Sequence, residues 1–92
     1  MKTYTFHFYS DPGHGWLAVK RTVLHMLGVA DKITTYSYQR GQTVYLEEDC
    51  DAYTVCMALK AQGYRIEAVD HHTDRRSPIR SYDRYRNEPK EN

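Results

Sequence analysis

Residues 33–48 read Ile-Thr-Thr-Tyr-Ser-Tyr-Gln-Arg-Gly-Gln-Thr-Val-Tyr-Leu-Glu-Glu, and this stretch carries the clearest fold signal in the sequence. Its two ends, residues 33–38 and 43–48, are rich in β-branched and aromatic residues, which is typical of strands. The polar residues between them, 39–42, include Gly41, which tolerates the positive φ that a tight turn needs. The stretch therefore predicts an antiparallel β-hairpin.

The segment before this hairpin begins with the pattern of a strand and a turn. Residues 3–9 alternate and are rich in aromatic residues, so they predict a strand that directs Tyr4, Phe6 and Phe8 toward the core. Residues 10–15 contain one proline and two glycines and predict a reversal of the chain.

A short helix is expected between that turn and the hairpin. Residues 16–19 are a four-residue apolar run whose period is compatible with a strand or a helix, and we favour a strand. Residues 20–27 then carry apolar residues at helical spacing. Gly28 stands where a left-handed C-terminal cap would end the helix.

A second helix and a last strand follow the hairpin. Asp49 or Asp51 is expected to cap a helix that runs to Gln62 and ends at Gly63. Its core stripe is expected to consist of Ala52, Val55, Cys56 and Leu59. Residues 64–70 alternate again and predict a strand. Together these elements predict an α+β fold with an antiparallel sheet of four to five strands and two helices packed on it.

The length and the composition bound the domain organisation. A chain of 92 residues has room for one core and no deep internal chamber, so we expect function at the surface. Large apolar residues become scarce after residue 71. We therefore expect one α+β domain over residues 1–71 and a basic, tyrosine-containing tail over residues 72–92 that has no packing of its own.

Several compartments and functional classes are disfavoured by the sequence. No apolar run approaches the roughly 18 residues of a membrane span, and residues 1–20 lack the pattern of a signal peptide. Cys50 and Cys56 lie six positions apart in the expected second helix, which predicts no disulfide between them. We expect a cytoplasmic protein without a membrane partner.

The five histidines do not have the spacing of a metal or catalytic site. Zinc ligands usually come in closely spaced pairs, and the neighbours His71 and His72 should point to opposite faces of a strand. No cysteine has a neighbouring histidine to activate it, and residues 11–15 match no phosphate-binding motif. We therefore expect no enzyme, cofactor, metal or small-molecule substrate. A small nuclease using His14 with His71 or His72 is the enzymatic alternative.

The charge distribution and the tyrosines predict a binding surface. The net charge is only +1, yet residues 47–51 carry four acids and residues 75–86 carry five of the eight arginines. Arginine contacts phosphate bidentately and tyrosine stacks on bases, so this mixture is suited to RNA, single-stranded DNA or an acidic protein groove. The candidate residues of the tail are Arg75, Arg76, Arg80, Tyr82, Arg84, Tyr85 and Arg86. A second basic group consists of Lys20, Arg21, Lys32 and Arg40. Whether the acidic patch or the basic tail dominates binding stays open.

Three stretches of the sequence, residues 8–21, 36–41 and 44–51, resemble small open reading frames of phages and other mobile elements. This match spans about residues 4–70, and the chain also resembles phage-encoded anti-CRISPR proteins that inhibit the type I-F surveillance complex. The resemblance implies a non-enzymatic inhibitor that binds Cas subunits near the guide RNA in the host cytoplasm and blocks hybridisation of target DNA. It assigns no individual contact residue. The alternative is a small nucleic-acid-binding regulator from a phage or mobile element.

Overall fold

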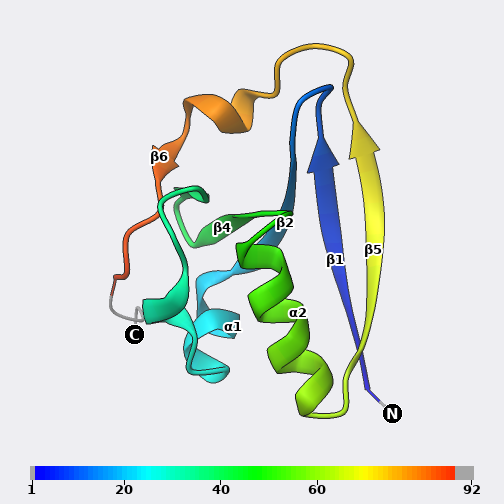
Figure 1. The fold of residues 1–92 in the computed structure, drawn as a ribbon, viewed down its shortest axis with the longest axis vertical. Helices are drawn as coiled ribbons and strands as arrows, with labels where there is room; N and C mark the ends of the chain where they lie inside the picture. Colours follow the sequence, from blue (N-terminus) through cyan, green and yellow to red (C-terminus); the bar gives the residue numbers. More distant parts are fainter. Residues whose placement is uncertain (1, 89–92) are drawn as a thin grey trace.

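The computed structural model describes residues 2–88 and has an α+β architecture, as the sequence predicted (Figure 1). Six strands form one sheet with the order β5-β1-β2-β4-β3-β6. The strands are β1 (Thr3–Ser10), β2 (Gly15–Lys20), β3 (Tyr38–Arg40), β4 (Thr43–Glu47), β5 (Arg65–His72) and β6 (Asp83–Arg84). The two α-helices are α1 (Arg21–Met26) and α2 (Asp51–Ala61), and short 3₁₀ helices span Ala30–Lys32 and Pro78–Ser81.

The sheet is mixed, whereas the sequence predicted a purely antiparallel one with fewer strands. Strands β1 and β5 pair in parallel over their whole length, and the other four strand pairs are antiparallel. The reason is the connection between β4 and β5. A helix between two strands returns the chain to the end where the first strand began, so α2 delivers β5 parallel to β4 and to β1. The hairpins constrain only strands that are consecutive along the chain.

The main core lies between the sheet and α2, which crosses one face of the sheet (Figure 1). Val55 and Leu59 of α2 are fully buried, and Ala52 is nearly so. The expected stripe on α2 is thus confirmed, with Cys56 half-buried at its margin. Phe6 is buried in the same core, and Tyr4 and Phe8 pack against it, as the alternation of residues 3–9 predicted.

The turns and helix ends were largely predictable. Residues 41–42 connect β3 to β4, so the expected hairpin is confirmed. Gly28 and Gly63 have φ of 70° and 86° and stop the two helices in the left-handed region that glycine tolerates. Residues 16–19 lie in β2, which confirms the strand that we favoured there.

Asp51 has a different role from the helix cap that the sequence predicted. Cys50 occupies the N-cap position of α2 and makes no side-chain capping bond. The buried Asp51 carboxylate instead accepts hydrogen bonds from the Thr34 N–H, the Thr34 hydroxyl and the Ser37 hydroxyl at 2.5–3.1 Å. These bonds hold residues 34–37 in turns, which is why β3 begins at Tyr38 and not at Ile33.

The segment after β5 packs on the domain, contrary to the expectation of a tail without packing. It crosses from β5 at one edge of the sheet to the other edge, where β6 pairs with β3 (Figure 1). Ile79 and Tyr85 are only 3% and 4% exposed. Ile79 covers Trp16 and Tyr38, and Tyr85 enters the main core and donates a hydrogen bond to the Ala30 carbonyl. The apolar residues Ile79 and Tyr85 of this segment are therefore part of the two apolar clusters of the domain.

No helix in residues 2–88 is long and apolar enough to cross a membrane.

Candidate binding face of the sheet

The face of the sheet opposite α2 is only partly covered. Because side chains alternate along a strand, the odd-numbered residues of β1 lie on this face while Phe6 and Phe8 enter the core. The register carries the same face across the sheet. His7 pairs with Ala18 of β2, and Ala18 pairs with Tyr45 of β4. On the other side of β1, Tyr9 pairs with His71 of β5.

Five aromatic side chains on this face form a continuous row, which we call the aromatic platform. It consists of His7, Tyr9, Tyr45, His71 and Tyr82. The ring of His71 stacks on Tyr9 with centroids 4.8 Å apart and an interplanar angle of 17°. Tyr9 contacts Tyr45 edge-on at 6.3 Å, and Tyr45 lies 5.2 Å from Tyr82. The row therefore runs across the sheet from β5 to the C-terminal segment.

The platform combines accessible rings with accessible cations. His7 and His71 are exposed, and the three tyrosines are half-buried. The Arg40 guanidinium lies 5.0 Å from the centre of the Tyr82 ring, and Lys20 lies within 3.4 Å of the Thr43 hydroxyl. Within residues 2–88, neither cation forms an ion pair. Both remain free to neutralise an anion.

Burial raises the pKa of the Tyr45 hydroxyl, and the nearby Tyr82 and Tyr9 add to the effect. The hydroxyl is therefore neutral at physiological pH and can donate a hydrogen bond. A neutral ring also keeps the platform free of negative charge, which is compatible with a partner rich in phosphate.

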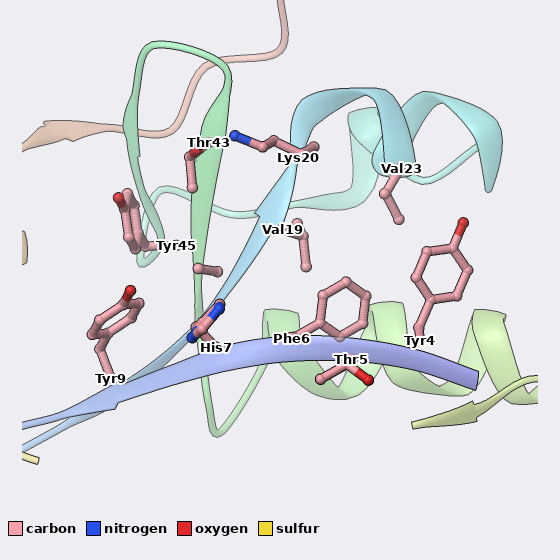
Figure 2. A pocket seen from close by; sticks show the side chains of 11 residues that line it. Tyr4, Thr5, Phe6, His7, Tyr9, Val19, Lys20, Val23, Thr43 and Tyr45 are labelled. Atoms are coloured by element: carbon pink, nitrogen blue, oxygen red, sulfur yellow. Dashed lines mark hydrogen bonds between the residues drawn. The ribbon is translucent and has the colours of Figure 1, made fainter. Parts of the chain in front are cut away.

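A hollow of about 420 Å³ opens beside the platform, between β1 and β2 (Figure 2). Figure 2 shows the rings of Tyr9 and Tyr45 next to each other at one side of the hollow, with Lys20 pointing toward Thr43 above it. Tyr4 and Phe6 lie at the other side, facing Val23 of α1. The hollow is thus lined both by platform residues and by apolar residues such as Phe6 of the core and Val23 of α1.

A second hollow, of about 520 Å³, lies near Trp16 and is less suited to binding an anion. Its two cations, Arg80 and Arg84, share the lining with the acids Glu47 and Asp49. Arg80 is also engaged by an ion pair with Asp11, and Arg84 donates a hydrogen bond to the Thr35 carbonyl. Arg80 is therefore not available to an anion in the way that Lys20 and Arg40 are, and Arg84 shares its surroundings with two acids.

Arg80 and Arg84, predicted as partner contacts, mainly hold the C-terminal segment in place. Arg80 donates two hydrogen bonds of 2.7 and 2.8 Å to the Asp11 carboxylate, and its guanidinium lies 5.6 Å from the centre of the Trp16 ring. The Arg84 guanidinium lies 4.5 Å from the Tyr38 ring. Both cations are therefore used as packing groups over the two buried aromatic rings.

Arg21, Tyr85 and Arg86 also make internal contacts. Arg21 is buried, donates to the Gln39 side chain at 2.9 Å and to the Arg86 carbonyl at 3.0 Å, and lies 5.6 Å from the Tyr85 ring. Arg86 pairs with Glu88 at 3.1 Å and more weakly with Asp83 at 3.8 Å. A buried cation cannot reach a partner, so the prediction that Arg21 lies on the binding surface was wrong.

The remaining predicted cations are exposed. They are Lys20, Lys32, Arg40, Arg75 and Arg76. Lys20 and Arg40 lie beside the platform, and Tyr82 is a member of it. The structure therefore brings two residues of the second basic group and one residue of the C-terminal segment together on one face.

The histidines and cysteines of residues 2–88 are spread over several elements of the fold. No group of three histidine, cysteine or acidic side chains there is placed to hold a metal ion. His71 contacts His7 at 2.7 Å, whereas His72 bonds Ser10 and Asp74, so the two neighbours do face opposite sides. Burial and the adjacent Asp51 raise the pKa of the Cys50 thiol, and burial raises that of Cys56. Both effects oppose thiolate formation.

The binding residues predicted from the sequence do not include His7, Tyr9, Tyr45 and His71. One local signal was available, because His7 and Tyr9 occupy the non-core positions of an alternating strand. Their stacking with His71 depends on the parallel register between β1 and β5, which no local pattern encodes.

Comparison with protein-family models, curated proteins and solved structures found no match to this chain.

Proposed function

We propose that this protein is a non-enzymatic binding protein whose aromatic platform takes single-stranded RNA. The observation that supports the proposal is the unbroken row of five rings on an open sheet face, with two free cations beside it. Aromatic rings on an exposed sheet stack with unpaired bases, each contributing about 1–3 kcal/mol. Lys20 and Arg40 would neutralise the phosphates of the same strand.

The resemblance described above supplies a biological setting for this activity. We expect the strand to be the guide RNA of a type I-F CRISPR surveillance complex, in the cytoplasm of an infected host cell. The protein would bind Cas subunits beside the guide and block hybridisation of target DNA. Guide RNA lies in channels lined by Cas lysines and arginines. The accessible acids Glu47, Glu48 and Asp49 would engage those Cas cations, whereas Asp51 of the same patch is buried and does not reach a partner. The exposed Arg75 and Arg76 would add further positive charge.

The platform is tested by measuring RNA affinity. A labelled single strand of about 12 nucleotides covers a site of this size, and fluorescence anisotropy gives its Kd. We expect replacement of both Tyr9 and Tyr45 by serine to weaken binding about tenfold or more, since two stacking surfaces are lost. Tyr53→Ser is the matched control, because Tyr53 is 65% exposed on the solvent side of α2. Equal affinity of the double variant and the wild type would contradict the proposal.

The role of the cations is read from the salt dependence in the same assay. Replacing Lys20 and Arg40 by glutamine removes two phosphate contacts, so the slope of log K against log salt should become shallower by about 1.4.

The proposed CRISPR setting is tested separately, by adding the protein to a purified type I-F complex and measuring hybridisation of target DNA. Binding to free RNA without any effect on the complex would favour the nucleic-acid-binding regulator.

A further inference from the structure

The sheet is split between β1 and β2. The two strands pair only from His7 with Ala18 to Ser10 with Gly15, although β1 begins at Thr3 and β2 continues to Lys20. Over the unpaired part, β1 stays with β5 and β2 stays with β4. The two halves of the sheet therefore diverge toward α1, and the hollow of about 420 Å³ occupies the gap.

The hydrogen-bond pattern tells which backbone groups face this split. The Arg65 N–H donates to the Lys2 carbonyl and the Thr73 N–H to the Ser10 carbonyl, so the even-numbered residues of β1 point their backbone groups at β5. The odd-numbered residues of β1 point the other way. The N–H and C=O of Thr5, which lines the hollow, are thus directed into the split without a strand partner.

On the β2 side of the split, Lys20 provides one backbone hydrogen-bond donor and one positive charge. The Gly15 carbonyl accepts a hydrogen bond from the Glu48 N–H, and the Arg21 N–H donates one to the Gln42 carbonyl. The odd-numbered residues of β2 therefore direct their backbone groups toward β4, and the even-numbered residues direct theirs toward β1. The Lys20 N–H therefore faces the split, and its ammonium group stands at the rim of the hollow (Figure 2). Phe6, Val19 and Val23 supply an apolar interior.

We propose that this split is a nucleobase pocket, in which one unstacked base of the bound strand inserts between β1 and β2. This inference rests on the proposed RNA binding. The Thr5 N–H and C=O would bond the donor and acceptor that every base carries on its pairing edge, and Lys20 would contact the adjoining phosphate. His7, Tyr9 and Tyr45 line both the platform and the hollow, so a strand stacked on the platform reaches the split directly.

The shape of the split favours a base over a peptide strand. A β-strand needs a run of paired residues, but the split closes at His7 and Ala18, and β2 turns into α1 after Lys20. Thr5 and the Lys20 N–H are the backbone groups that remain within the hollow. A flat heterocycle with apolar faces and two or three polar edge atoms is suited to such a recess.

The pocket is tested on the full chain by following backbone amides in NMR spectra during titration with the same single-stranded RNA. We expect the Thr5 and Lys20 amide protons to shift downfield saturably, because both gain a hydrogen-bond acceptor. Thr5→Pro removes the N–H that faces the split but no bond to β5, and should weaken RNA binding about fivefold. Thr3→Pro is the matched control, since Thr3 has the same backbone orientation but does not line the hollow.

Val23→Trp tests the same pocket from a different element, because a larger side chain on α1 fills the recess and leaves β1 unchanged. It should abolish the Thr5 shift while RNA binding that depends on Tyr9 and Tyr45 persists. RNA binding with an unmoved Thr5 amide in the wild type would overturn the pocket alone. Failure of the wild type to bind any RNA would overturn the proposed function and the pocket together. A shift of Thr5 produced by a Cas peptide and not by RNA would also overturn the pocket.

Discussion

Asp11 is the residue that ties the C-terminal segment to the body of the domain. Its carboxylate is 1% exposed and accepts hydrogen bonds from the Gly13 and His14 backbone, from the Ser77 backbone and from the Arg80 guanidinium. These bonds join the turn after β1 to a segment more than 60 positions away. Arg80, which the sequence predicts as a partner contact, therefore stabilises the fold through Asp11.

This ion pair predicts a specific acid sensitivity. The Arg80 hydrogen bonds hold the pKa of Asp11 far below its ordinary value. A lowered folded-state pKa means that the stabilisation is fully present above the unfolded value of about 3.9 and is lost as the pH falls below it. We expect Asp11→Asn to lower the Tm at neutral pH and to make the Tm less dependent on pH in the acid range. Asp74→Asn is the control, because that side chain is 98% exposed. Identical acid profiles for Asp11→Asn and the wild type would show that the pair contributes nothing.

Strand β5 is an element with one paired and one free edge. Its odd-numbered residues direct their backbone groups to β1, as the Arg65 bond to Lys2 shows, so its even-numbered residues direct theirs to solvent. The free edge carries the charged residues Arg65, Glu67 and Asp70, and charges of this kind discourage pairing with other strands. In β5, the odd-numbered residues therefore bond to β1 through their backbone, and the even-numbered residues between them have no backbone partner in the sheet of residues 2–88.

Two proline variants distinguish those roles. Val69→Pro removes an N–H that points at β1, so we expect it to lower the free energy of unfolding by about 2 kcal/mol or more. Ala68→Pro removes an N–H that points to solvent, and should cost at least about 1 kcal/mol less. Chemical denaturation of both variants measures the difference. Equal costs, or a larger cost at Ala68, would contradict the observed register.

At the scale of the whole fold, residues 2–88 form two apolar clusters on opposite faces of one sheet. The larger cluster lies under α2, and the smaller one joins Trp16, Tyr38 and Ile79 under the C-terminal segment. A domain of this size has little surplus stability, because so much of its surface stays exposed. The C-terminal segment, which contributes to both clusters through Ile79 and Tyr85, is therefore part of the minimal folded unit.

Deleting the chain from residue 77 onward should consequently unfold or loosen the domain. Burial of Ile79 and Tyr85 contributes about 1.5–3 kcal/mol each, and the deletion also removes the Arg80 ion pair. The single tryptophan, Trp16, reports the change directly, and we expect a red shift of its fluorescence and a broad, weakly cooperative thermal transition. The exposed pair Arg75→Ser and Arg76→Ser is the control and should keep the native spectrum. A truncated chain with native emission and a sharp transition would refute the assignment.

Features that depend on residues close together in the chain were predictable from the sequence. The hairpin around Gly41, the ends of α1 and α2 and the buried stripe of α2 follow from turn chemistry and apolar spacing, which act over a few positions. The sequence also indicated the tyrosine-rich and arginine-rich composition from which a binding surface is built.

Which of those residues are free to bind depends on contacts between distant parts of the chain. The parallel pairing of β5 with β1 brings His71 onto Tyr9, and Asp11 captures Arg80, in both cases across more than 60 positions. Such contacts are selected by the burial and pairing available in the assembled chain, so neither partner carries a local sign of them. Arg80 pairs with the buried Asp11, whereas Arg40 lies beside Tyr82 and is exposed to solvent. The sequence around each arginine does not distinguish these two roles.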